Sequence, residues 1–162
     1  MSSTRFIPAC LGVALLASWP AACLAGDTTL KLNATVTRNC TVAALPLMFG
    51  TVADNVTVTA QTRVFVNCTP GTPYTVTMDN GLWVKSGQRR MSNPGAKGVR
   101  EYLDYDIYRN AARTQRWGGT PATGVSGVTG AAQVTLIAYG SALGKKVSAG
   151  AYTDTVVVTL TF

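Results

Sequence analysis

Asp104 and Asp106 are the two side chains whose spacing comes nearest to a catalytic pair. They lie two residues apart and would share one face of a strand, where two carboxylates can hydrolyse a glycosidic bond. Tyr102, Tyr108 and nearby arginines instead favour an outer face on which acids and bases are paired. The sequence contains no histidine, which excludes Ser–His and Cys–His catalysis and histidine metal ligands. We therefore expect a protein that is not an enzyme and that needs no metal or cofactor.

Basic side chains form two stretches that could, in principle, contact phosphate groups. They are Lys85, Arg89, Arg90, Lys97 and Arg100, followed by Arg109, Arg113 and Arg116. Because the first residues of the chain resemble an export signal, we expect no nucleic-acid partner. Solvated loops, or contact with anionic surfaces, are the preferred interpretation of the net charge of +7.

The first 25 residues have the composition of a secretory signal peptide. Arg5 precedes an apolar stretch over residues 11–17, and small residues lead to Ala25, after which we place the cleavage. The apolar stretch is shorter than the roughly 20 residues of a membrane-spanning helix, so we expect a chain that does not span a membrane. Cys23 leaves lipidation open, although Pro20–Ala22 is a poor match to the apolar tripeptide that precedes a lipidated cysteine.

Cys40 and Cys68 are the two cysteines left after that cleavage. In an oxidising compartment they are most simply one disulfide, with two buried thiols as the alternative. The bond would close a loop of about 28 residues and stabilise the fold by on the order of 3–4 kcal/mol. Two cysteines cannot complete a tetrahedral metal site.

Apolar and polar residues alternate with period two along the chain, which is typical of strands with one buried face. The chain has 162 residues with 47% hydrophobic and 13% charged side chains, enough for one domain with a core and too few charges for a disordered or coiled-coil protein. No window keeps a helical stripe over three turns, so we predict an all-β sandwich, with a loop over the Gly- and Thr-rich residues 118–132. Strands are predicted at residues 28–37, 55–60, 61–68, 74–78, 101–109, 133–139 and 152–162.

The predicted strands at residues 28–37 and 152–162 indicate how the domain could be completed. An immunoglobulin-like sandwich needs about seven strands, and six are predicted from Cys40 onwards, so the domain is expected to lack one strand beside its last. An uncovered strand edge promotes aggregation unless another strand pairs with it, and residues 28–37 could be given to a neighbouring molecule for that purpose. The pattern fits equally well if residues 28–37 are the first strand of their own sheet.

Five segments, in the same order along the chain, resemble the spore coat protein U domain, the subunit family of archaic, Csu-type chaperone–usher pili. They are Arg-Asn-Cys-Thr-Val at 38–42, Phe-Gly at 49–50, Val-Asn-Cys-Thr at 66–69 with Pro73-Tyr74, residues 105–113 with Trp117-Gly118, and residues 150–158. The resemblance implies an incomplete immunoglobulin-like β-sandwich without its last strand, and pairing of Cys40 with Cys68. It also implies that a periplasmic chaperone lends a strand and that subunits polymerise at an outer-membrane usher.

On this resemblance, residues 26–37 are an N-terminal donor-strand extension and residues 38–162 are the pilin domain. The donor row is Leu30, Leu32, Ala34 and Val36, and the strand lining the acceptor groove carries Val156, Val158, Leu160 and Phe162. The expected function is that of a structural subunit of a cell-surface fimbrium, with neighbouring pilin subunits as partners, that serves adhesion and biofilm formation. The short loops leave open a place in the shaft or as an adaptor.

Two other functions remain as alternatives. The last strand also resembles that of a small outer-membrane β-barrel, although the expected disulfide and the scarcity of long strands argue against it. A secreted sugar-binding sandwich would be a complete, closed fold that is stable as a monomer.

Overall fold

The computed structural model describes residues 31–94 and 98–162. The chain divides into two units, Met1–Thr35 and Val36–Phe162. The predicted signal peptide and Leu30 lie outside the described residues. Within residues 31–37 the backbone belongs to no strand and the side chains are exposed, so the strand predicted at 28–37 is not formed there. In this isolated chain, the described part of that segment is therefore not the first strand of its own sheet.

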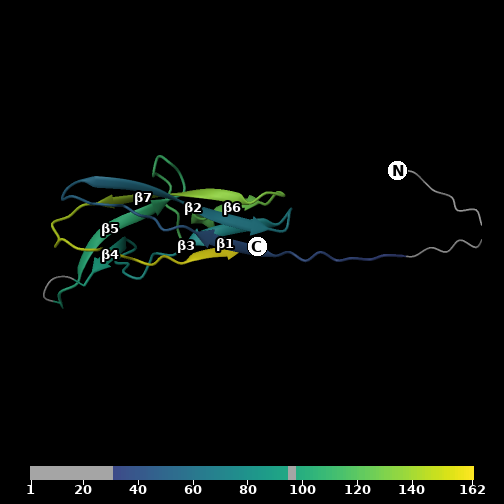
Figure 1. The fold of residues 1–162 in the computed structure, drawn as a ribbon, viewed down its shortest axis with the longest axis horizontal. Helices are drawn as coiled ribbons and strands as arrows, with labels where there is room; N and C mark the ends of the chain where they lie inside the picture. The colour runs from purple at the N-terminus through teal and green to yellow at the C-terminus, as the bar shows by residue number, and fades with distance from the viewer. Residues whose placement is uncertain (1–30, 95–97) are drawn as a thin grey trace, which may run out of the picture. The chain divides into compact units, whose positions relative to one another are not determined.

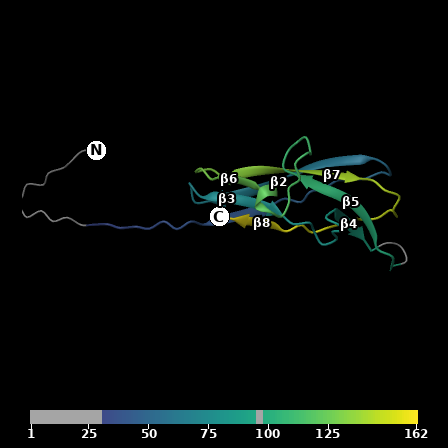
Figure 2. The ribbon, with the colours of Figure 1, turned by 180° about the vertical axis from the view of Figure 1, so that it is seen from behind.

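In the described residues, eight strands form two antiparallel sheets, with orders β1-β2-β7-β5-β4 and β6-β3-β8 (Figures 1 and 2). The strands are β1 (Cys40–Ala44), β2 (Thr57–Cys68), β3 (Pro73–Met78), β4 (Arg89–Asn93), β5 (Glu101–Tyr108), β6 (Val125–Val128), β7 (Val134–Leu143) and β8 (Val158–Thr161). One short 3-10 helix, η2 (Pro121–Thr123), completes the described secondary structure. The predicted all-β immunoglobulin-like sandwich is confirmed.

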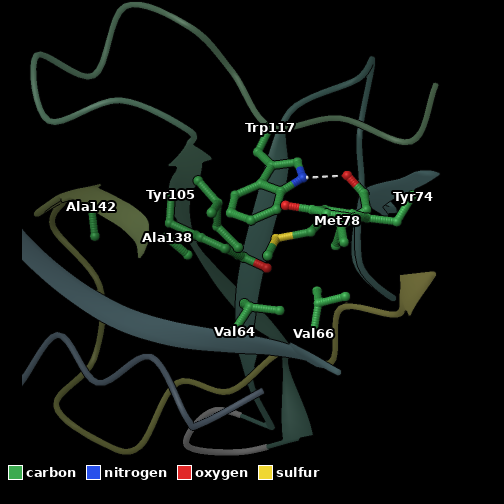
Figure 3. Packing of buried hydrophobic residues seen from close by; sticks show 10 residues of the cluster. Val64, Val66, Tyr74, Met78, Tyr105, Trp117, Ala138 and Ala142 are labelled. Carbon is green, nitrogen blue, oxygen red and sulfur yellow. Dashed lines mark hydrogen bonds between the residues drawn. The ribbon is translucent and has the colours of Figure 1, made fainter. Parts of the chain in front are cut away.

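Side chains from both sheets meet in one apolar core around Trp117 (Figure 3). The indole of Trp117 has no exposed surface, and its Nε1–H donates a hydrogen bond to the carbonyl oxygen of Val76 at 2.9 Å. This bond satisfies the one polar group of a side chain that otherwise contributes only apolar area. The alternating residues predicted to point inwards on β3 and β5 are buried as expected: Tyr74, Val76, Met78, Leu103, Tyr105 and Ile107.

Strand predictions in two parts of the chain differ from the structure in their bounds. Residues 55–60 and 61–68 were predicted as separate strands, yet residues 57–68 form the single long strand β2, which pairs with β7 as far as Thr57. Of the strand predicted at 152–162, only the residues of β8 form a ladder of backbone pairs with a neighbouring strand, β3. Before it, Thr153 forms an isolated bridge with Ser92.

Three strands were not predicted: β1, β4 and β6. β4, with the sequence Arg-Arg-Met-Ser-Asn, has no simple alternation and is held at a sheet edge by its register with β5. β6 lies inside the segment that we predicted to be a loop, and four of its residues pair with β3. Tertiary pairing therefore overrides a weak local preference at β4 and β6.

The disulfide predicted from the sequence is present between Cys40 and Cys68. These cysteines are register partners at the ends of β1 and β2. The bond therefore joins the first strand of the domain to the long strand on which the larger sheet is built.

Replacing Cys40 and Cys68 together by Ser should lower the free energy of unfolding by on the order of 3 kcal/mol, because the closed loop constrains the unfolded chain. Urea unfolding followed by tryptophan fluorescence measures the loss. Reductant should reproduce it in the natural chain and leave the double variant unchanged. Equal midpoints for the natural chain with and without reductant would contradict a stabilising role for the bond.

Candidate functional site

A groove of about 1120 Å³ lies between two segments that carry little strand structure, residues 44–54 and residues 145–158. Its floor consists of apolar side chains from both sheets, so an occupant would rest directly on the core. The floor residues are Val64, Met78, Met91, Leu103, Tyr105, Ile107 and Ala138.

The outer edge of β8 lines up with this groove. Among the described residues β8 pairs only with β3, and the carbonyl oxygen of Val157 accepts from the backbone N–H of Asp79 at 3.1 Å. In an antiparallel ladder the backbone groups of successive residues point alternately to the two sides. Those of Val156, Val158 and Leu160 therefore point away from β3, while their side chains pack against the core. The edge offers apolar side chains inwards and hydrogen-bonding groups outwards.

The opposite wall continues from β1, which is also an edge strand with β2 as its one partner in the described chain. Leu47 and Phe49 lean over Gly140 on β7, where an added Cβ would stand 2.8 Å from the Leu47 Cδ2 and Phe49 Cε1 atoms. Phe49 also meets Tyr105 edge-on, with ring centroids 6.0 Å apart. Glycine at position 140 thus lets this wall settle onto the sheet.

Glu101 fixes the rim of the groove at residues 148–152. Its Oε2 atom accepts from the Ser148 backbone N–H at 2.7 Å, and its Oε1 atom accepts from the Ser148 hydroxyl at 3.1 Å. The Tyr152 hydroxyl donates to Oε2 at 3.0 Å. These bonds favour the ionised form and lower the pKa of Glu101, the backbone bond from Ser148 contributing most.

Two aspartates fix the next part of the rim. The Oδ1 atom of Asp154 accepts from the Leu82 backbone N–H at 2.9 Å, and its Oδ2 atom accepts from the Tyr105 hydroxyl at 2.6 Å. Burial raises the pKa of Tyr105 far above its ordinary value, and the bond to Asp154 adds to that shift. Asp79 Oδ1 accepts from the Val157 backbone N–H at 2.9 Å. Side-chain carboxylates therefore hold a segment that has almost no strand pairing of its own.

Arg89 lies under this region with no exposed side-chain surface. Its guanidinium forms a 2.8 Å ion pair with Asp106 and donates to the carbonyl oxygens of Met78, at 3.1 Å, and Trp117, at 2.8 Å. Burial lowers the pKa of Arg89, and Asp106 opposes that shift. The expectation that this basic stretch is solvated is therefore wrong at Arg89. Its buried guanidinium on β4 connects Asp106 of β5 to the carbonyl oxygen of Trp117.

Asp104 and Asp106, the carboxylate pair considered from the sequence, form ion pairs with basic side chains. Asp106 also pairs with Arg116 at 2.8 Å, and Asp104 pairs with Lys145. Both acids are thus part of ion pairs, as the alternative interpretation of this face predicted. In residues 31–94 and 98–162, no three His, Cys, Asp or Glu side chains gather into a metal-binding group. The same residues include no helix that is long and apolar enough to cross a membrane.

The structure brings together only part of the predicted site. Val156 and Val158 line the groove; Leu160 packs against the core beyond the groove lining, and Phe162 is 53% exposed. The side chains of Leu32, Ala34 and Val36 are exposed. Their roles as donor and acceptor remain predictions.

Sequence reasoning missed the wall at residues 45–50 and the carboxylates that hold the rim. The wall has a signal in the spacing of Leu45, Leu47 and Phe49, although this row is out of step with Cys40 and Val42 of β1 and spans Pro46. The role of Glu101 has no local signal, because its partners lie about fifty residues further along the chain.

A family model described as the Spore Coat Protein U domain matches residues 27–159. The chain belongs to that family. The curated "Protein U" of Myxococcus xanthus is 34% identical to this spore coat protein U domain over 104 residues. That match covers 60% of this chain and 56% of the relative, so the chain spans little more than half the relative's length.

This spore coat protein U domain is also similar to solved pilus proteins. One is a chain of the chaperone–tip adhesion subunit pre-assembly complex CsuC–CsuE from the archaic chaperone–usher Csu pili of Acinetobacter baumannii. That similarity has a TM-score of 0.61 and 29% identity, over 79% of this chain and 40% of the other. The minor tip subunit HdaB of the Escherichia coli Hda pilus has a TM-score of 0.36 and 18% identity, over 75% of this chain and 79% of the other.

Changing Gly140 to Ala should lower the free energy of unfolding by about 1–3 kcal/mol, because the new methyl group displaces Leu47 and Phe49. Gly130→Ala is the matched control, since an added Cβ there has nothing within 4 Å; it should change stability by less than about 0.5 kcal/mol. Chemical unfolding measures both. Equal effects of the two substitutions would contradict the packing described for this wall.

The hydrogen bonds to Glu101 should protect the Ser148 amide from exchange in a pH-dependent way. Because the folded-state pKa of Glu101 lies below its ordinary value of 4.5, protection is complete above that pH and declines as pH falls towards the lowered pKa. Glu101→Gln should reduce protection and remove this decline. Hydrogen-exchange NMR, corrected for intrinsic rates, measures both; an unchanged decline in the variant would assign it to another group.

Proposed function

We propose that this protein is a structural subunit of an archaic chaperone–usher pilus, completed by an extended segment of another subunit. The groove carries the proposal, because it joins an apolar floor to two strand edges, β1 and β8, that pair on one side only within the described chain. The alternative of a secreted sugar-binding protein predicts a closed sandwich, and an open groove onto the core argues against it. Membership of the Spore Coat Protein U domain family and the likeness to a Csu pilus complex support the same function.

The occupant that we propose is a donor strand equivalent to residues 28–37. Leu30, Leu32, Ala34 and Val36 would turn inwards onto the floor, and the alternate polar residues would face solvent. Each wall is longer in sequence than the stretch from Leu30 to Val36. The outward backbone groups of Val156 and Val158 would then find partners on the inserted strand.

Insertion would be strongly favourable. Burial of four apolar side chains, at about 25 cal/mol per Å² of apolar surface, supplies several kcal/mol. Each new backbone hydrogen bond adds about 1 kcal/mol. We propose that a periplasmic chaperone first supplies a less well-fitting strand, and that the next subunit's donor segment replaces it at an outer-membrane usher. Assembly would then need no other energy source at the exchange step.

A mature chain that lacks residues 26–37 tests this proposal. It should stay monomeric in light scattering, bind a synthetic 28–37 peptide with slow dissociation, and unfold at a higher temperature once the peptide is bound. The same peptide with Leu32→Asp should bind at least tenfold more weakly, whereas one with Thr35→Ser, on the polar row, should bind normally. Polymerisation by the truncated chain as efficient as that of the full chain would overturn donor-strand exchange.

A fused version covers the case in which the truncated chain folds poorly. Here residues 28–37 follow Phe162 through a flexible Gly/Ser linker long enough to reach the groove. The natural segment should raise the unfolding temperature above that of the same fusion carrying Leu32→Asp. Equal unfolding temperatures would mean that the groove does not select the donor row.

A further inference from the structure

Four side chains at the β4 edge form a cluster that plays no part in the groove: Trp83, Arg90, Arg100 and Tyr102. We call it the arginine–aromatic cluster. Arg90 lies on β4 and Tyr102 on β5. In both ribbon views these strands occupy the end of the Val36–Phe162 unit that is far from the C-terminus (Figures 1 and 2).

Each arginine in the cluster is stacked on a ring. The guanidinium carbon of Arg90 stands 4.0 Å from the centroid of Tyr102, and that of Arg100 stands 4.2 Å from the centroid of Trp83. The two rings are neighbours, with centroids 6.2 Å apart and planes tilted by 54°. Such cation–π contacts are worth about 0.5–1 kcal/mol at partly exposed sites and fix the orientation of the charged groups.

Both guanidiniums also have one anchored nitrogen. Arg90 Nε donates to the Trp83 carbonyl oxygen at 2.8 Å, and Arg100 Nη1 donates to the Ser92 hydroxyl at 3.1 Å. Among the described residues, neither arginine has a carboxylate partner. Their remaining N–H groups thus form a rigid pair of donor forks, the geometry that recognises carboxylates bidentately.

Exposed apolar side chains border the cluster in the sequence. Leu82 is 68% exposed, Val84 42% and Val99 69%. A ligand at this surface would therefore meet two cations and, beside them, the C–H surfaces and ring edges that suit the apolar faces of sugar rings.

We propose that the arginine–aromatic cluster binds an acidic polysaccharide, with uronate carboxylates on Arg90 and Arg100 and sugar rings against the edge of the Trp83 ring and its apolar neighbours. Charge complementarity supports this occupant, because the two cations have no carboxylate partner in the described chain and the protein carries a net charge of +7. Single-stranded nucleic acid fits less well, since each ring already has an arginine on it and the tilt leaves no parallel faces for successive bases. Binding needs one domain only and does not rest on the proposed function.

Binding of oligo-alginate, a polyuronate, to the mature protein at about 50 mM salt tests the inference, with dextran as the neutral control. Calorimetry should show binding to alginate and none to dextran. Arg90→Gln/Arg100→Gln should weaken alginate binding at least tenfold. Arg38→Gln/Arg63→Gln removes the same charge from two exposed positions outside the cluster and should weaken it less than twofold.

Two further variants separate geometry from charge and guard against misfolding. Arg90→Lys/Arg100→Lys keeps the charge without the planar forks and should weaken binding at least threefold, with an unchanged unfolding temperature. Trp83→Leu should weaken it by a similar factor. Equal losses in the cluster and control arginine pairs would reduce the effect to net charge and overturn the proposal, as would tighter binding of an oligothymidylate through the same residues.

Discussion

The hydrogen-bonding requirement of a strand edge is the constraint on which the structure of this protein depends. Backbone N–H and C=O groups at a sheet edge must find partners or remain in water. Here two edges, those of β1 and β8, come within 8 Å of each other between Cα atoms, yet they belong to different sheets. The space between them continues into the groove, so in the described chain backbone groups without strand partners lie beside apolar side chains that line an open groove. One extended strand, as proposed, would satisfy both needs.

The molecule keeps this groove in shape without strand pairing. Glu101, Asp79 and Asp154 accept hydrogen bonds from backbone groups along or beside the rim, and the buried Arg89 ties together the strands beneath it. Charge-assisted bonds of this kind are stronger than neutral ones. Within the described chain, these bonds hold the rim without an added strand.

The sequence predicts the parts of this fold that follow from period-two alternation. The buried rows of β3 and β5 were identified correctly, because Val76 and Tyr105 sit in unbroken patterns. Of the predicted terminal strand only β8 forms, since the residues before it line the groove and lack a second neighbouring strand. Arg89 was misjudged because its burial depends on Asp106 and on the carbonyl groups of Met78, Asp79 and Trp117, which only the folded chain assembles. Glu101 gave no signal for the same reason: distant segments create its role.

The position of the disulfide has a mechanical consequence. Residue 39 exchanges hydrogen bonds with Thr69, and the next residue, Cys40, is bonded covalently to Cys68. Tension applied to the chain ahead of residue 38 therefore passes straight into β2, the long strand that pairs with both β1 and β7. β1 cannot be peeled away from that end. Residues 45–50, the groove wall that follows β1, would therefore stay in position under a tension that would detach an edge strand without a disulfide.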